Sequence, residues 1–436
     1  MVCIAGALLG INISKTYSIV FVPAIIFLAV FPFINIKYSI YTLVFLIPFE
    51  ELIAFRGATL IKFWGIYVLA VYIVQNISES KNLGFETSLV HKVALLLLPL
   101  SILSEYFAID KVAGLSGIIT QTQVIVFSIV VYTSVKRQAE RILLARIFLI
   151  ACVTVSLLQA LQYFDISTFS FLEVEPTPEG RMQGYTGDPN RFGMMLLSAL
   201  YLGIASIAFS RNLFWKSITL IGILILIFTI GITISRAIIF TFIFSFLIFA
   251  AWQFYKGKQI RFSILLALCI IVIAFLQITK TNEQHLVAMR QNIVRRFTLL
   301  ATHHSPSTEA RMEMARVGVN MILANPLGVG PGNFSRGALR LVEIRRDAHN
   351  SILEVGGELG FPGLACFLIM IFLAIKPFFS KTNSTADNFE KIIIFSLGVF
   401  FIASLSLSAI RSKVFWFLIG LAAASGEHIK NPEIEM

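Results

Sequence analysis

Charged residues are scarce in this chain of 436 residues. They make up 14% of the sequence, whereas 57% of the residues are hydrophobic. A soluble protein of this length carries charge on about a quarter of its residues. The scarcity of charge excludes a soluble globular protein. The abundance of apolar residues, which include 40 Phe, predicts a polytopic membrane protein.

Cysteines and the usual metal- and nucleotide-binding motifs are also scarce. The four cysteines lie in apolar runs without a metal-ligand spacing, so we interpret them as small membrane-embedded residues. The sequence contains no Asp-x-Asp motif, no His/Cys cluster and no Walker loop. We therefore expect neither a metal ion nor a cofactor. The net charge of +11 suits anionic lipid or a phosphorylated ligand, but no soluble basic domain exists to hold nucleic acid.

Long apolar runs fill most of the chain, and a transmembrane helix needs roughly 20 apolar residues. The candidate spans are 2–13, 17–34, 37–49, 59–77, 91–108, 117–134, 142–163, 191–209, 214–231, 236–253, 262–279, 352–375, 391–409 and 412–425. Some of them are short enough to be half-spans. We predict an all-α fold with about 12 transmembrane helices, within a range of 12–14.

Lysines and arginines in the short loops predict the orientation of the chain. Basic residues cluster after the spans that end near 134, 209, 253 and 375. Such clusters mark cytoplasmic loops, which also places both termini in the cytoplasm. The opposite face then carries three segments: 164–190, the tight turn near 232–236 and the polar interval 280–351.

The interval 280–351 divides the chain into an N-terminal bundle (1–279), a large outer loop (280–351) and C-terminal spans with a short tail (352–436). Arginine dominates the loop, and its planar fork grips phosphate oxygens. The loop arginines are Arg290, Arg295, Arg296, Arg311, Arg316, Arg336, Arg340, Arg345 and Arg346. Contact with lipid headgroups is the simpler interpretation of most of them.

Two helices are predicted inside this loop. Residues 283–300 fit an amphipathic helix lying at the membrane surface. Ser307 is expected to cap a second helix over 308–324. Its shared face contains Ala310, Met314, Val317 and Met321. The glycine-rich segment 328–332 can cradle an anion with its backbone N–H groups, or it can be a plain turn.

Three side chains at the outer membrane boundary are candidates for chemistry. His349 precedes a span and can accept a proton near neutral pH, unless it only caps that helix or lies at the interface. Arg236 lies at the only break in a long apolar run, and Arg191 begins a span behind Asp188. Either arginine can face a polar cavity or extend to the headgroups. Arg191 can also be a salt-bridged terminus.

Two acids occur near the membrane in the span that follows His349. Glu354 and Glu358 lie one helical turn apart, and acids at that depth face a cavity or pair with arginine. We expect them to position the arginines or His349. A diphosphate leaving group and a hydroxyl nucleophile would need this combination, because arginines stabilise the departing charge and a base removes the proton.

Several segments resemble the O-antigen ligase and polymerase superfamily. One run extends from Glu309-Ala310-Arg311 to Asn325-Pro326-Leu327-Gly328-Val329-Gly330-Pro331-Gly332-Asn333-Phe334. A second joins His349-Asn350-Ser351-Ile352-Leu353 to Glu358-Leu359-Gly360-Phe361-Pro362-Gly363. Ser235-Arg236 and Asp188-Pro189-Asn190-Arg191 add to the similarity.

The resemblance implies a GT-C-like glycosyltransferase of the bacterial inner membrane, with about twelve spans and one large periplasmic loop. It implies metal-independent transfer of a glycan from undecaprenyl diphosphate to an acceptor. On this basis His349 would activate the acceptor, and Arg191 and Arg236 would bind the donor diphosphate. The further candidates for substrate binding are Arg311, Asp188, Glu354, Glu358, Arg345 and Arg346.

The first functional hypothesis is an O-antigen ligase whose acceptor is the lipid A–core oligosaccharide and whose active site faces the periplasm. A polymerase that extends another lipid-linked repeat unit, with the same fold and donor, is the alternative. A membrane transporter is the alternative of another class. It would show internal repeats with interrupted helices at mid-membrane, whereas the polar groups here gather at one face.

Overall fold

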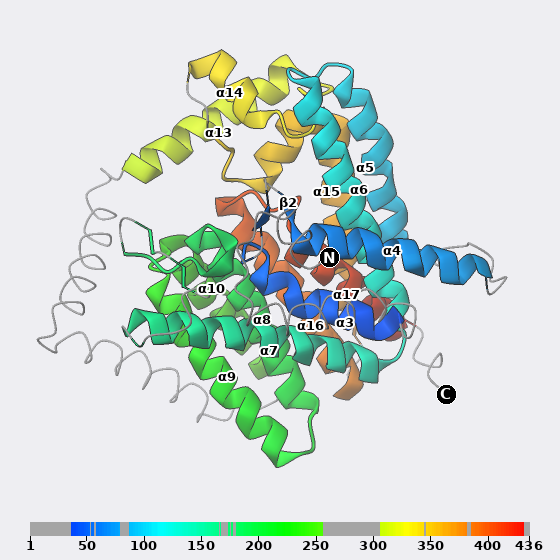
Figure 1. Cartoon of the computed structure of the whole chain (residues 1–436), viewed down its shortest axis with the longest axis vertical. Helices are drawn as coiled ribbons and strands as arrows, with labels where there is room; N and C mark the ends of the chain where they lie inside the picture. The colour runs from blue at the N-terminus through cyan, green and yellow to red at the C-terminus, as the bar shows by residue number, and fades with distance from the viewer. Residues whose placement is uncertain are drawn as a thin grey trace, which may run out of the picture.

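The structure is a computed structural model that describes residues 36–52, 54–55, 58–78, 87–164, 166, 173–174, 176–177, 180–255, 306–343, 346–381 and 385–430. Within these residues the chain forms 13 α-helices, four short 3₁₀ helices and a single two-stranded hairpin (Figure 1). The prediction of an all-helical fold is confirmed for this part of the chain.

The α-helices are α3 (Ile36–Leu46), α4 (Leu60–Ser78), α5 (Leu89–Glu105), α6 (Lys111–Ser134), α7 (Gln138–Tyr163), α8 (Pro189–Phe209), α9 (Leu213–Ile232), α10 (Arg236–Tyr255), α13 (Pro306–Ala324), α14 (Phe334–Val342), α15 (Ser351–Ile375), α16 (Thr385–Ala403) and α17 (Lys413–Lys430). The 3₁₀ helices are Ile47–Phe49, Gly184–Thr186, Lys376–Phe379 and Ser404–Ser406. Strands β1 (Ala54–Phe55) and β2 (Ala58–Thr59) pair antiparallel.

Seven helices among the described residues are long and apolar enough to cross a membrane. They are α6, α7, α8, α9, α10, the span Ser351–Phe379, which contains α15, and the helix Asp387–Ser406. The chain is therefore a polytopic membrane protein, as its composition predicts. The total of 12–14 spans stays a prediction, because 2–13, 17–34 and 262–279 lie outside the described residues.

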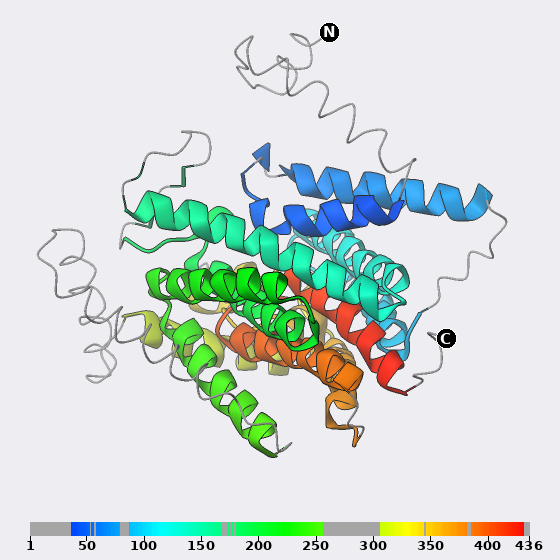
Figure 2. The same ribbon diagram turned by 90° about the horizontal axis from the view of Figure 1, so that it is seen from below.

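Helix α8 forms the centre of the bundle and is buried along most of its length. Helices α7, α9 and α16 pack against it, while α17 packs against α16 and α6. Figure 2 shows α3 and α4 lying across one face of this bundle. Glycines permit the close approach: Gly193 lies against Ile238 of α10, and Gly203 against Ile223 of α9. Small residues at helix contacts are typical of membrane proteins, where van der Waals packing replaces the hydrophobic effect.

Helices α13 and α14 lie beyond one end of the bundle, beside α5, α6 and α15 (Figure 1). Met314, Val317 and Met321 of α13 are buried and Ala310 is half-buried, so the predicted face is confirmed for three of its four residues. The predicted cap at Ser307 is wrong, because the helix already begins at Pro306. Proline suits a first helical position, where no N–H donor is needed. Helix α14 is an additional element that the sequence pattern did not indicate.

The segment 326–332 docks these two helices onto α15. Helix α15 is interrupted at Gly360, whose φ is 68° and ψ is −168°. The N–H of Phe361 donates to the carbonyl of Pro326 (2.9 Å). In return, Val329 N–H donates to Gly357 O (3.0 Å). The break therefore frees carbonyls of α15 for hydrogen bonds with the glycine-rich segment.

Some sequence predictions fall on residues that the structure does not describe. These are the amphipathic helix 283–300 with Arg290, Arg295 and Arg296, and the candidate substrate-binding residue Arg345. The division into 1–279, 280–351 and 352–436 also stays a prediction.

Candidate active site

A cavity of about 560 Å³ lies among α3, α4, α6, α8 and the turn that joins α16 to α17. Its charged and polar lining residues are Glu50, Glu51, Thr59, Thr120, Gln123, Thr186, Arg191, Asp347, Glu354, Ser408, Arg411, Ser412 and Lys413. Its apolar lining, which comes mostly from α3, α4 and α6, includes Leu43, Ile66, Val68, Leu69, Phe127 and Val130. The cavity therefore suits an amphiphilic ligand.

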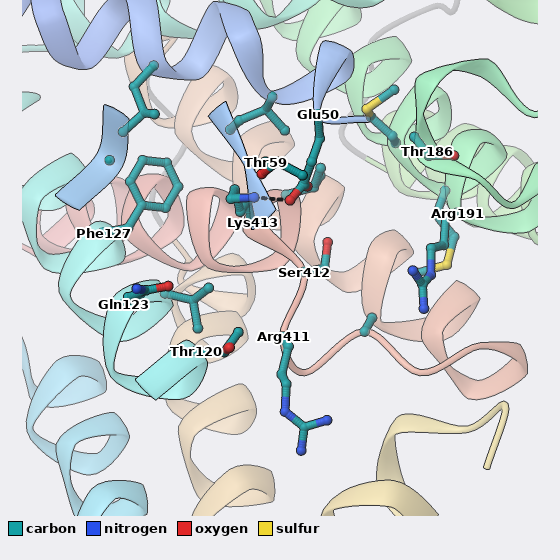
Figure 3. A pocket seen from close by; sticks show the side chains of 18 of the residues that line it. Glu50, Thr59, Thr120, Gln123, Phe127, Thr186, Arg191, Arg411, Ser412 and Lys413 are labelled. Carbon is teal, nitrogen blue, oxygen red and sulfur yellow. Dashed lines mark hydrogen bonds and ion pairs between the residues drawn. The ribbon is translucent and has the colours of Figure 1, made fainter. Parts of the chain in front are cut away.

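Arg191 and Arg411 extend into this cavity from different elements. Figure 3 shows Arg191 on α8 and Arg411 on the α16–α17 turn, both directed to the same side of the view. Phe127 and Gln123 of α6 line another wall in the same view. The cations of the site thus come from segments far apart in the sequence.

Asn190 holds the start of α8 against the turn between α9 and α10. Its side-chain oxygen accepts a hydrogen bond from Ser235 Oγ (2.6 Å) and another from Arg181 Nη2 (3.1 Å). Arg191 directly follows Asn190, and Arg236 directly follows Ser235. The hydrogen bond between Asn190 and Ser235 therefore brings these two predicted site residues to adjoining helix starts. Arg236 is half-buried and is not among the residues that line the cavity.

The backbone is strained beside Arg236. Ile234 has a φ of 50°, which is rare for a β-branched residue. Among the described residues, Glu343 and His349 are the other non-glycine residues with positive φ. All three conformations therefore occur at, or within two residues of, predicted site residues, and such strain gathers at functional sites.

Asp188 caps α8 by accepting hydrogen bonds from the backbone. Its carboxylate accepts hydrogen bonds from the N–H groups of Asn190 (2.7 Å) and Arg191 (2.9 Å). This fixes the first turn of α8, from which the Arg191 side chain extends. Asp188 therefore acts on the site by orienting α8 as well as by its charge.

His349 stands immediately before α15 in a left-handed conformation, with a φ of 46°. Asn350 is the cap of that helix, since its side chain accepts from Ile352 N–H (2.9 Å) and Leu353 N–H (3.1 Å). The alternative that His349 caps the helix is therefore wrong. Its imidazole is left available for another role.

The surroundings of His349 keep its imidazole neutral. Burial lowers its pKa below the usual value, and the charge of Arg311 lowers it further. Asp347 and Asp188 act in the opposite direction, and Arg191 adds to the lowering. The structure therefore gathers Arg191, Arg311 and His349 within electrostatic range of one another.

Arg191 and Arg311 differ from the other cations of the site. Within the described parts of the chain, neither guanidinium has a carboxylate at ion-pair distance. Burial lowers the pKa of Arg311, and Asp188 partly offsets this. Two arginines without an ion-pair partner form a natural site for an anion.

Glu354 and Glu358 pair with an arginine that the sequence interpretation missed. Arg411 Nη1 donates to Glu354 Oε1 (3.1 Å), and Arg411 Nη2 donates to Glu358 Oε2. The expectation that these acids pair with arginine is confirmed, but the partner is Arg411, which was not among the candidates. That they position Arg191, Arg236 or His349 stays a prediction. A signal existed in the sequence: Arg411 lies between the last two candidate spans, on the predicted outer face.

The segment after α3 contributes two further acids that were missed. Glu50 accepts a hydrogen bond from Lys413 Nζ at the start of α17. Glu51 lies against Gly187, next to the cap of α8. Burial raises the pKa of Glu51, Arg191 counteracts this, and Glu50 and Asp188 add to it. Neither acid belongs to a sequence motif, so only the three-dimensional structure shows that both lie at the site.

Comparison with known protein families gives a match over part of the chain. Residues 221–368 match the family model described as O-antigen ligase. The predicted resemblance is thereby confirmed over that segment, which we call the O-antigen ligase domain. No curated protein matches the chain.

The O-antigen ligase domain contains five of the predicted site residues: Arg236, Arg311, His349, Glu354 and Glu358. Arg191 and Arg411 lie outside it, one on each side in the sequence. The cavity is therefore completed by helices that precede and follow the matched segment.

Among the candidates of the domain, Glu354 lines the cavity, whereas Arg236, Arg311, His349 and Glu358 are not lining residues. Two further candidates lie elsewhere. Arg346 is exposed in a separate shallow depression beside Glu309, Glu313 and Arg316 of α13. The glycine-rich segment uses its N–H groups internally: Gly328 N–H donates to Asn325 O (2.8 Å), and the next two donate to α15. Of the two alternatives for this segment, the structure therefore favours a docking turn.

Proposed function

We propose that this protein is an O-antigen ligase, which transfers a glycan from undecaprenyl diphosphate to the lipid A–core oligosaccharide. The observation that carries the proposal is that Arg191, which lines the cavity, and Arg311 lie within electrostatic range of His349, although Arg311 and His349 are not lining residues of the cavity. Two guanidinium groups without an ion-pair partner can bind a diphosphate, and a neutral imidazole can accept the proton of a hydroxyl group. The match to the O-antigen ligase family model supports the same class of reaction.

The donor fits both parts of the cavity. Its diphosphate would lie at Arg191 and Arg311, where the N-termini of α8 and α15 add favourable electrostatics. Arg236, at the adjoining start of α10, would extend this cationic surface. The polyprenyl chain would follow the apolar lining from α3, α4 and α6.

The transfer would be a direct displacement with inversion. The acceptor hydroxyl oxygen forms a bond to the anomeric carbon while the bond from that carbon to the diphosphate oxygen breaks. The hydroxyl proton passes to the His349 imidazole. Arg191 and Arg311 stabilise the charge that develops on the leaving diphosphate, which is the role a metal ion has in other glycosyltransferases.

Replacing His349 with Ala tests this proposal. We expect the transfer rate to fall by about 100- to 10,000-fold, because a general base contributes that much. The control is His428→Ala, at the far end of α17, which should retain activity. The assay is transfer of lipid-linked glycan to lipid A–core in proteoliposomes. Full activity of His349→Ala in properly inserted protein would refute the assignment.

The glycolipids of a deletion strain separate ligase from polymerase. Loss of a ligase leaves lipid-linked polymer intact and the lipid A–core bare. Loss of a polymerase leaves core that carries a single repeat unit. The second pattern would replace the ligase proposal with a polymerase.

A further inference from the structure

Glu51 is an acid of the cavity that takes no part in the proposed transfer. Its side chain lines the cavity, and the residue is exposed. Within the described parts of the chain, its carboxylate accepts no hydrogen bond and has no cation at ion-pair distance. The preceding residue differs, because Glu50 is paired with Lys413. One of two adjacent acids therefore stabilises the fold, and the other is open to a ligand.

The fold holds Glu51 in place at both its backbone and its side chain. Its backbone N–H donates to the carbonyl of Tyr185 (3.1 Å). The ring of Phe49 stacks on that of Tyr185, with 5.8 Å between the ring centroids. The carboxylate lies against Gly187, where an added Cβ atom would be 2.4 Å from Glu51 Oε2. The acid is therefore fixed beside the start of α8, which also carries Arg191.

The charge of Glu51 is unfavourable for the proposed diphosphate. Arg191 acts on Glu51 and favours its ionised form. A diphosphate bound at Arg191 would meet this second negative charge, and like charges repel one another. A site that bound only an anion would be weakened by this acid. A ligand that also brings hydroxyl groups is not, because a carboxylate accepts strong hydrogen bonds from them.

Arg191 connects Glu51 to the reaction centre. Its charge acts on both Glu51 and His349, as does the charge of Asp188. Glu51 lines the cavity proposed for the donor, whereas His349 is not one of its lining residues. The hydroxyl groups nearest to Glu51 are therefore those of the donor, whose first sugar is bonded directly to the diphosphate.

We infer that Glu51 distinguishes the donor from the lipid product of transfer, by accepting hydrogen bonds from hydroxyl groups of the first sugar. This rests on the proposed function, which places the diphosphate at Arg191. Transfer removes the sugar, and the diphosphate gains an ionisable oxygen when the glycosidic bond breaks. The product therefore loses the hydrogen bonds to Glu51 and is repelled more strongly, which favours its release.

Binding of two kinds of lipid tests this role in the full-length protein reconstituted in nanodiscs. One probe is bare undecaprenyl diphosphate, which is the product. The other is a panel of undecaprenyl diphosphates that carry glucose, galactose, N-acetylglucosamine or N-acetylgalactosamine. The wild-type protein should bind at least one sugar-bearing lipid about 10-fold or more tightly than the bare lipid, which corresponds to one charge-assisted hydrogen bond.

The variant Glu51→Gln keeps the shape of the side chain and removes its charge. Bare lipid should bind more tightly to it than to the wild type, and the preferred sugar-bearing lipid more weakly. The preference should thus fall to about 3-fold or less. Its unfolding temperature should stay normal, because no ion pair is lost. Glu309→Gln in α13, outside the cavity, is the matched control and should keep the wild-type preference.

A purely structural role of Glu51 predicts a different result. A negative charge at the start of α8 stabilises that helix. Loss of the charge would then lower the unfolding temperature and leave the preference between the lipids unchanged, which would overturn the inference. Weaker binding of lipid A–core by Glu51→Gln, with an unchanged preference between the lipids, would overturn it too, because Glu51 would then contact the acceptor.

The wild-type protein separates this inference from the proposed function. Equal binding of bare and sugar-bearing lipids would overturn the role of Glu51 and leave the proposed function standing. Failure to bind any undecaprenyl diphosphate would overturn the proposed function, and the role of Glu51 with it.

Discussion

Arg191 and Arg411 present the same guanidinium group to one cavity in two different settings. Arg191 has no carboxylate at ion-pair distance within the described residues, so its charge is free for a ligand. Arg411 is held by Glu354 and Glu358, whose side chains are 11% and 4% exposed. The first arginine is therefore suited to binding an anion, and the second to holding the fold and orienting acids.

Alanine substitution should separate the two roles. Arg191→Ala should lower transfer by about 100-fold or more, the loss expected for one donor to a developing oxyanion, with normal thermal unfolding. Arg411→Ala should destabilise the protein by about 3–5 kcal/mol, because two buried carboxylates lose their partner. Thermal unfolding in detergent measures the stability of both variants, and transfer in proteoliposomes measures their activity. Equal loss of stability in the two variants would contradict the distinction.

In the proposed mechanism, the pKa of His349 determines the pH dependence of transfer. Burial and Arg311 lower its pKa below that of a free histidine, about 6.5. The base must be neutral to accept a proton, and it is neutral above its pKa. The acid limb of the kcat/KM profile should therefore lie below pH 6.5, and activity should be full at pH 7. An acid limb above pH 6.5 would contradict this.

At the scale of elements, the break in α15 joins the bundle to α13 and α14. A Cβ atom at Gly360 would lie 2.1 Å from the carbonyl oxygen of Pro326. A Cβ atom at Gly328 would lie 2.1 Å from the carbonyl oxygen of Glu358. Both glycines have positive φ. The backbones are thus in direct contact, and the approach leaves no room for any side chain.

Gly360→Ala should therefore loosen α13 and α14 from the bundle. The left-handed conformation alone costs about 1–3 kcal/mol for a residue with a Cβ atom. The control is Gly398→Ala in α16, where the nearest atom to a new Cβ is 3.9 Å away. We expect faster proteolysis between α13 and α15 in Gly360→Ala alone. Equal protection of both variants would contradict the docking role.

At the scale of the molecule, the basic short loops predict which face each end of a helix occupies. Arg211, between α8 and α9, should lie in the cytoplasm, and Arg340 of α14 in the periplasm. In a chain whose four native cysteines are replaced with alanine, Arg340→Cys should react with a membrane-impermeant maleimide in intact spheroplasts. Arg211→Cys should react only after lysis. The reverse pattern would invert the proposed topology.

Helices could be predicted from the sequence because hydropathy is a local property. The predicted spans 214–231 and 236–253 agree closely with α9 (Leu213–Ile232) and α10 (Arg236–Tyr255). The approach of His349 to Arg191 could be predicted too, since both begin spans on one face. Arg411 could have been found in the same way, because it lies between the last two candidate spans on the predicted outer face. Glu51 could not, because its place at the site depends on tertiary packing. Arg346 was predicted at the site, but it lies beside α13 instead.

The bond between Glu50 and Lys413 has a consequence for biosynthesis. It joins a residue just after α3 to the first residue of α17. The N-terminal part of the chain is synthesised first, so α3 is made before almost all the other described helices. The cavity wall remains incomplete until α17 arrives, although the O-antigen ligase domain ends at residue 368. The cavity is therefore complete only after α17 has been synthesised.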